Sequence, residues 1–105
     1  MSFAIEKSIQ SMRDIEEAFV FIAEGDLDRA VHFLVAVENT LETISSHPMI
    51  GSNRAFENKK LSDLRLWPVK DFSNYLIFYL PDRGNKTIKV VRLLNASRDF
   101  DLIFE

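Results

Sequence analysis

The side chains that could bind an anion or stabilise a negatively charged transition state lie mostly in the second half of the chain. Residues 51–105 hold ten basic and seven acidic side chains, whereas residues 1–50 hold three basic and nine acidic ones. The net charge of −3 argues mildly against a dedicated nucleic-acid binder. The asymmetry, which also arises by chance in small domains, places any contact with an anionic target in the second half.

Arg92 is the most informative of these basic residues. Alternate residues of a strand point the same way, so Arg92 would share a row with Ile88, Val90 and Leu94. A guanidinium in an apolar row either emerges at an open face of the sheet or is buried with a partner. Burial without a partner would cost several kcal/mol, so one of these two arrangements is expected.

The other candidates flank the same segment. Arg65 lies between two leucines and two residues before Trp67, Arg98 follows the last predicted strand, and Lys59 and Lys60 precede the first. Each could equally form a salt bridge or be solvated. Together they would form a basic, aromatic-edged concave face suited to phosphate, RNA or an acidic peptide. The candidate contact residues are therefore Lys59, Lys60, Arg65, Trp67, Arg92 and Arg98.

The sequence carries no recognisable catalytic or cofactor motif. It lacks a phosphate-binding P-loop, a dinucleotide-binding glycine pattern, a zinc-protease helix motif and a nucleophile elbow. It has no cysteine, and its two histidines, His32 and His47, fall on a predicted helix and in a loop. We therefore predict no catalytic residue of a known motif, no metal site and no cofactor.

Length and composition indicate one domain over residues 1–105. The chain is 47% hydrophobic and 28% charged, which is typical of a globular protein with one core. No apolar run is long enough to span a membrane. Residues 1–10 lack the basic head and apolar body of a secretory signal. These observations predict a cytoplasmic protein with no membrane association.

Residues 11–46 have helical periodicity. We expect a first helix that begins at Ser11, with Asp14 completing a capping box, and ends at Gly25. Asp26 can cap a second helix that ends before Pro48. The short connection predicts an antiparallel hairpin. The stripes expected to face a sheet comprise Met12, Ile15, Phe19, Ile22 and Ala23 in the first helix and Leu27, Ala30, Val31, Leu34, Val37, Leu41 and Ile44 in the second.

Three aromatic and β-branched segments follow, at residues 64–69, 75–80 and 87–94. Turn-forming residues separate them, so the strands should be antiparallel neighbours. Residues 75–80 lack polar alternation and are the expected central strand, and residues 2–8 could add a short fourth strand. The predicted fold class is α+β, with a helical hairpin packed on one face of a small antiparallel sheet.

Several short patterns follow one another along these segments, at Asp14–Glu17, Ala30–Phe33, Leu41, Pro48–Gly51, Leu64–Arg65, Val69, Tyr75–Tyr79 and Ile88–Asp99. Each pattern is loose by itself, but their joint order and spacing are fairly specific. In this order and spacing the chain resembles the RelE/ParE superfamily, the toxins of type II toxin–antitoxin systems. The resemblance covers roughly residues 12–100.

The superfamily contains two activities, and the RelE-type activity fits this sequence poorly. RelE-type toxins share a set of catalytic residues with which they cut messenger RNA on the ribosome. Of their alternating basic pair, Arg65 is retained, whereas Trp67 is not basic. Their central-strand arginine falls on Leu76, their terminal arginine on Arg98, and their tyrosine near Phe104. Losing such groups commonly costs about 10²–10³ in rate apiece, so little nuclease activity is expected.

The ParE-type toxins resemble this sequence more closely. They lack that catalytic set and arrest growth by poisoning DNA gyrase. The resemblance implies a non-enzymatic toxin, a role in plasmid stabilisation, and a hetero-oligomer with a ParD-like antitoxin. The antitoxin would fill the groove between hairpin and sheet. Two alternatives stay open: a RelE-like ribosome-dependent nuclease, and a non-toxic module that only binds an antitoxin.

Overall fold

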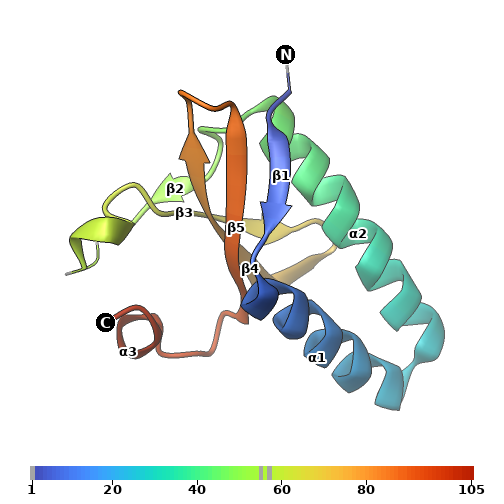
Figure 1. The fold of residues 1–105 in the computed structure, drawn as a ribbon. Helices are drawn as coiled ribbons and strands as arrows, with labels where there is room; N and C mark the ends of the chain where they lie inside the picture. The colour runs from blue at the N-terminus through green and yellow to red at the C-terminus, as the bar shows by residue number, and fades with distance from the viewer. Residues whose placement is uncertain (1, 55, 57) are drawn as a thin grey trace.

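The computed structural model describes residues 2–54, 56 and 58–105. Two helices lie on one side of a five-stranded sheet, and a 3₁₀ helix and a short C-terminal helix lie on the other (Figure 1). This is the predicted α+β fold class. In chain order the elements are β1 (Ala4–Lys7), α1 (Ile9–Gly25), α2 (Leu27–Ser46), β2 (Ser52–Asn53), the 3₁₀ helix η1 (Lys59–Leu61), β3 (Arg65–Val69), β4 (Phe72–Asp82), β5 (Thr87–Asn95) and α3 (Phe100–Ile103).

The sheet order is β1-β5-β4-β3-β2, so β4 is the central strand, as predicted. β4 pairs antiparallel with β3 and β5, and β1 pairs parallel with β5. β4 begins at Phe72, earlier than expected, because Lys70 and Asp71 alone make the turn and Asp71 adopts a positive φ of 67°. An irregularity between Phe78 and Tyr79 shifts the register with β5. The helices cover one face of this sheet, as the hairpin pattern predicted.

The predicted start of α1 is wrong by one turn. Ser8 is the N-cap, and its hydroxyl oxygen accepts a hydrogen bond from the Ser11 backbone N–H at 3.0 Å. The Ser11 hydroxyl donates to the Ser8 carbonyl at 2.8 Å inside the first turn. The chain turns at Ser8 because β1 ends at Lys7 against β5, a non-local constraint that local capping patterns do not contain. Asp14 is consequently free for another role.

The face of α2 that packs on the sheet differs from the predicted stripe. Phe33 is fully buried, and its ring lies 5.2 Å from that of Phe72 and 5.1 Å from that of Tyr75. Val31 and Leu34, which were expected to face the sheet, are 50% and 37% exposed. The expected burial of Ala30, Val37, Leu41 and Ile44 is confirmed. The packed face is therefore rotated about the helix axis relative to the predicted one.

A second, smaller core fills the other face of the sheet. Phe78 and Leu94 meet Leu64 and Phe104 there, and Phe100 and Ile103 of α3 pack against them. The Phe78 ring lies 4.9 Å from the rings of both Phe100 and Phe104. Among the described residues, both faces of the sheet are therefore covered by packed side chains. In the part of the chain that the structure describes, no helix combines the length and apolarity needed to cross a membrane.

Candidate functional site

Arg92 is paired across the molecule with Asp14 of α1. Its Nε donates to Asp14 Oδ2 at 2.7 Å and its Nη2 donates to Asp14 Oδ1 at 3.1 Å. The Asp14 side chain is 5% exposed and the Arg92 side chain 21%. Of the two arrangements expected for Arg92, the structure shows burial with a partner. Its charge is therefore neutralised internally and is not free for a ligand.

Asp14 stands where β5 loses its neighbouring strand. β1 pairs with β5 only as far as Val90, and beyond that point the outer edge of β5 would be bare. Ser8 binds the next backbone groups of β5. Its N–H donates to the Val90 carbonyl at 3.0 Å, and its hydroxyl donates to the Val91 carbonyl at 2.9 Å. The Leu93 N–H then donates to Asp14 Oδ2 at 3.1 Å. The beginning of α1 thus satisfies the backbone groups that β1 leaves unpaired.

Arg65 holds the loop that connects α2 to β2. Its Nη1 donates to the Gly51 carbonyl at 2.7 Å and to the Met49 carbonyl at 3.3 Å. The buried Tyr79 hydroxyl donates to the Pro48 carbonyl at 2.8 Å and accepts the Gly51 N–H at 2.9 Å. Burial raises the pKa of Tyr79, and the Gly51 hydrogen bond and the Arg65 charge oppose that shift. Arg65 and Tyr79 therefore fix this loop from two sides.

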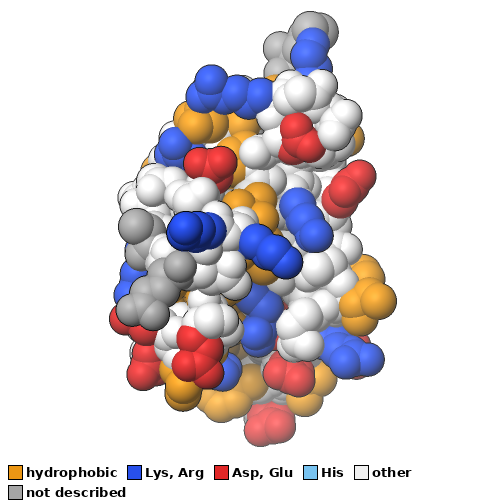
Figure 2. Space-filling view, turned by 60° about the vertical axis from the view of Figure 1, so that its left-hand side comes forward, with side chains coloured by type: hydrophobic (Ala, Val, Ile, Leu, Met, Phe, Trp, Pro, Cys, Tyr) orange, Lys and Arg blue, Asp and Glu red, His pale blue; other side chains and the backbone are white. Residues whose placement is uncertain are grey.

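The remaining sequence candidates do not converge on one surface. Trp67 packs against the core beneath the helices. Lys59 and Lys60 are exposed on η1, on the far side of the sheet from α1 and α2 (Figure 1). Figure 2 shows Lys and Arg scattered over that side of the molecule with Asp and Glu among them. The single basic concave face expected from the sequence is therefore not formed.

Arg98 is the sequence candidate that lies beside a hollow. The hollow is lined by side chains of α1 and the ends of β4 and β5, including Glu17, Phe21, Tyr75 and Asn95. Arg98 is exposed, and the ion pairs among the described residues do not include it. Its guanidinium is therefore available to a ligand that enters beside Phe21 and Tyr75.

A second hollow continues from Phe21 to the turn between the helices. It is lined by Phe21, Arg29, Phe72 and Tyr75 among others, with the Arg29 guanidinium 4.6 Å above the centre of the Phe72 ring. The two hollows share Phe21 and Tyr75 and together follow the junction of the hairpin with the sheet. We call this junction the hairpin–sheet groove and define it by Phe21, Arg29, Phe72, Tyr75 and Arg98.

Leu76 and Phe104, the positions that the resemblance aligns with a RelE-type arginine and tyrosine, lie in the second core. Leu76 is half-buried there, and Phe104 is 5% exposed with its ring against Phe78. Neither side chain can carry charge or transfer a proton. Within the described residues, no group of three or more His, Cys, Asp or Glu could hold a metal ion.

A comparison with known protein families finds a match over nearly the whole chain. The model of the ParE toxin of the type II toxin–antitoxin system parDE matches residues 5–100. The chain belongs to the ParE toxin family. A search of curated proteins found no match.

Two solved structures share the fold of this ParE-family chain. A chain of the chromosomal ParDE system from P. aeruginosa matches with a TM-score of 0.68 at 9% identity, over 90% of this chain and 96% of that one. A chain of the toxin–antitoxin complex RelBE2 from Mycobacterium tuberculosis matches with a TM-score of 0.63 at 14% identity, over 90% and 99%. At such low identity the likeness concerns the fold alone, which confirms the α+β prediction.

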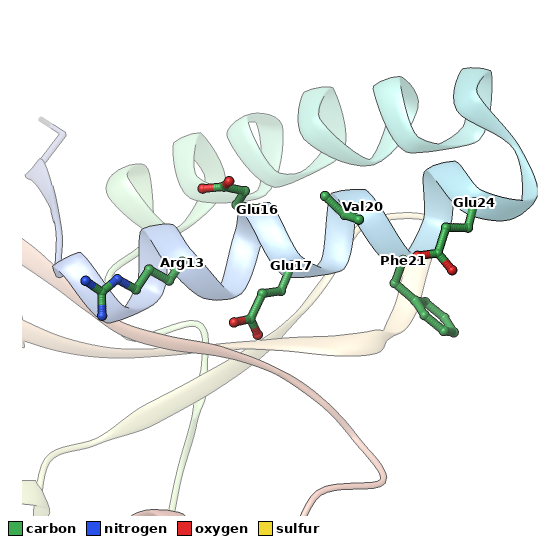
Figure 3. A pocket seen from close by; sticks show the side chains of 6 residues that line it. All are labelled: Arg13, Glu16, Glu17, Val20, Phe21 and Glu24. Atoms are coloured by element: carbon green, nitrogen blue, oxygen red, sulfur yellow. The ribbon is translucent and has the colours of Figure 1, made fainter.

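Sequence reasoning missed the residue at which the hollows of this ParE-family chain meet. Phe21 is 69% exposed and lines the two hollows of the hairpin–sheet groove and a third on the outer surface of α1. Figure 3 shows its ring pointing away from the helix. The signal was present: Phe21 falls outside the predicted apolar stripe, and a large aromatic side chain on the outer face of a helix indicates an interaction surface.

Proposed function

We propose that this ParE-family protein is the toxin of a toxin–antitoxin pair that arrests growth in the cytoplasm by poisoning DNA gyrase. The observation that carries the proposal is the pair Leu76 and Phe104. They occupy the places where a RelE-type nuclease needs arginine and tyrosine, and both pack in the second core. The protein would then act by binding its target rather than by cutting RNA.

The chemistry of RNA cleavage supports this choice. Attack by a 2′-hydroxyl requires a proton acceptor, stabilisation of negative charge and a proton donor to the leaving oxygen. Arg92, on β5 beside the central strand, is bound by Asp14 through two hydrogen bonds and offers no free charge. Arg98 remains exposed, and a single guanidinium can bind an anion but cannot supply both proton transfers.

A ParD-like antitoxin is the partner that we propose for the hairpin–sheet groove. The groove offers exposed aromatic surface at Phe21, the rings of Phe72 and Tyr75 at its floor, and the guanidiniums of Arg29 and Arg98 at its two ends. Aromatic residues and arginine contribute most to the affinity of protein interfaces. An antitoxin segment with apolar side chains and flanking carboxylates would match this groove.

The target is tested with two assays on the same purified protein. We expect inhibition of gyrase supercoiling, or trapping of cleaved DNA, while ribosome-bound messenger RNA stays intact. Cuts in the messenger at fixed codon positions would refute the proposal. Inactivity in both assays would instead favour an antitoxin-binding module without toxicity, the alternative that the acidic net charge of −3 keeps open.

The partner is tested by expressing the chain alone and together with the gene next to it. We expect growth arrest in the first case, relief in the second, and co-purification of the two proteins. A Phe21→Asp variant should lose co-purification, because a bound antitoxin segment would bury the new charge beside Tyr75 and Phe72. The matched control is Leu102→Asp, which places the same charge at an exposed residue of α3. Equal co-purification of both variants would remove the hairpin–sheet groove as the antitoxin site.

A further inference from the structure

The outer side of α2 carries an apolar stripe that the core does not use. Leu27, Val31, Leu34 and Val35 are 61%, 50%, 37% and 53% exposed. Their spacing of four, three and one residues puts them on one face of the helix. Single exposed apolar residues are ordinary, but four on one helical face form a continuous patch of the kind that binds another helix. We call these four residues the outer stripe.

Carboxylates continue the outer stripe along the same face. Glu38 and Glu42 stand seven residues, or two helical turns, after Val31 and Val35, and both are exposed. The Lys7 ammonium lies 2.6 Å from Glu38 Oε1, which shows that this end of the stripe faces the side of the molecule where β1 runs. The face of α2 is thus apolar toward its N-terminal end and acidic toward its C-terminal end.

The rest of the hairpin surface is acidic as well. Residues 9–46 contain eight acidic and two basic side chains, and of the acidic ones only Asp14 is buried. Figure 3 shows Glu16 and Val20 on the side of α1 toward α2 and Phe21 on its lower side. A hollow on α1 lined by Glu16, Glu17, Val20 and Phe21 joins these two sides. The acidic surface therefore extends from Phe21 across α1 to the side of this helix that faces α2.

We propose that the outer stripe is a second docking surface for the antitoxin, which binds here through an amphipathic helix with a cluster of Lys and Arg at one end. The apolar seam of that helix covers Leu27, Val31, Leu34 and Val35, and its basic end meets Glu38 and Glu42. This inference rests on the proposed antitoxin partner and adds a site and a charge pattern to it.

Charge selects this occupant over the others. A second copy of the chain would bring the same acidic border against this one, and like charges in an interface are unfavourable. An anionic lipid surface or a nucleic acid would be repelled for the same reason. A basic amphipathic helix gains both apolar burial and opposite-charge contacts, and it would bind faster at low ionic strength.

The experiment measures the Kd of the full chain for the purified protein encoded beside it, at low and physiological salt. The double variant Val31→Lys/Val35→Lys changes two exposed residues, so its melting temperature should match that of the wild type. We expect its Kd to rise about tenfold or more, since the lysines remove two apolar contacts and place charge in the interface, and the loss of interface anchors commonly has effects of this size. The matched control Leu102→Lys, at an exposed leucine of α3 that is 63% exposed, should leave the Kd unchanged.

A charge variant tests the second half of the inference. Glu38→Gln/Glu42→Gln removes the two exposed carboxylates that the basic end of the helix would meet, without changing side-chain size. We expect weaker binding at low salt and a smaller loss of affinity as salt rises. An unchanged salt dependence would overturn the basic-helix assignment.

The outcomes separate this inference from the proposed function. If the Val31→Lys/Val35→Lys variant binds like the wild type while Phe21→Asp does not, the outer stripe is not a docking surface and the antitoxin proposal stands. If the wild-type chain binds no protein from its own gene pair, the proposed function fails and this inference with it. A concentration-dependent homodimer that the double lysine variant dissociates would overturn the inference in favour of a second copy.

Discussion

The carboxylate of Asp14 binds both the side chain of Arg92 and the backbone N–H of the next residue, Leu93. The distances are 2.7 Å and 3.1 Å to the guanidinium and 3.1 Å to the N–H. One carboxylate of α1 therefore accepts hydrogen bonds from the guanidinium of Arg92 and from a backbone N–H at the edge of β5. These two donors lie 78 and 79 positions away in sequence. Removal of this carboxylate should affect the fold more than the loss of one surface ion pair would.

Asp14→Ala should lower the free energy of unfolding by about 2–4 kcal/mol. The substitution leaves a mostly buried guanidinium and a buried N–H without a partner, and breaking a buried pair from one side is strongly destabilising. A denaturant melt measures the change. Glu17→Ala, at an exposed carboxylate of the same helix, is the control and should change stability by less than about 0.5 kcal/mol.

A double variant checks the reason for that loss. Asp14→Ala/Arg92→Met removes the stranded charge together with its partner, so part of the lost stability should return. Equal stability of the single and double variants would show that the pair itself contributes little and that the Leu93 contact accounts for the effect.

Phe33→Ala should be far more damaging than Leu34→Ala. Phe33 is fully buried against Phe72 and Tyr75, so truncation should cost about 3–5 kcal/mol. Leu34 is 37% exposed, and its truncation should cost well under half as much. Chemical denaturation of the two variants gives the comparison. The reverse order would mean that α2 packs through the face expected from the sequence.

That difference shows what hydrophobic periodicity can determine. Residues 27–44 contain two overlapping apolar stripes, one through Val31 and Leu34 and one through Phe33 and Val37. Both have helical spacing, so the pattern predicts the helix correctly but cannot choose its buried face. The choice is made by the aromatic rings of β4, which lie far along the chain.

The same limit applies to the non-local parts of the fold and of the site. The hairpin, the three strands and the central position of β4 follow from local patterns and were predicted. The parallel pairing of β1 with β5 joins Ala4 to Thr87, and no local signal specifies it. The α3 helix has four residues, too few for a periodic pattern. The sequence predicts that Arg92 is either buried with a partner or exposed at an open face of the sheet. It does not identify Asp14 as that partner, because Asp14 also fits a helix-capping pattern.

Gly51→Ala and Gly25→Ala should have opposite effects on stability. A Cβ at Gly51 would lie 2.7 Å from the Tyr79 hydroxyl oxygen and 2.9 Å from the Leu66 carbonyl oxygen, so the loop must shift at a cost of about 1–3 kcal/mol. A Cβ at Gly25 meets nothing within 4 Å. Alanine there restricts the unfolded chain and should be neutral or stabilise by up to about 1 kcal/mol. Thermal melts of the two variants test the contrast, and a harmless Gly51→Ala would show that the loop is not tightly held.

Stability should decline above about pH 10 because of Tyr79. Burial raises the pKa of this hydroxyl above the value of about 10 that it has in the unfolded chain. The folded state then keeps a proton that the unfolded state releases, so the free energy of unfolding falls as pH rises from about 10 toward the folded pKa.

Melts of the wild type and of Tyr79→Phe between pH 8 and 11 separate this effect from other titrations. The variant should be less stable at pH 8, where it lacks the bonds to Pro48 and Gly51, and should lose less on going to pH 11. If the free energies of unfolding of the wild type and of Tyr79→Phe fall equally between pH 8 and pH 11, Tyr79 is not the cause of the decline.

Arg98 and Arg92 should differ in how their loss affects growth arrest. Arg98 is exposed beside Phe21 and Tyr75, so Arg98→Ala should leave the melting temperature within a few degrees of the wild type. If the exposed guanidinium contacts the target, toxicity and inhibition of supercoiling should nevertheless fall about tenfold, in line with the loss of one charged contact. Arg92→Ala should instead lower stability together with activity, because it leaves the buried Asp14 carboxylate without its partner.

Lys60→Ala, at an exposed cation on the far side of the sheet, is the control for charge alone and should retain activity. A stable Arg98→Ala variant with full toxicity would exclude Arg98 from the target contact. Activity lost equally in Arg98→Ala and Lys60→Ala would point to general electrostatic attraction rather than to a site beside Phe21.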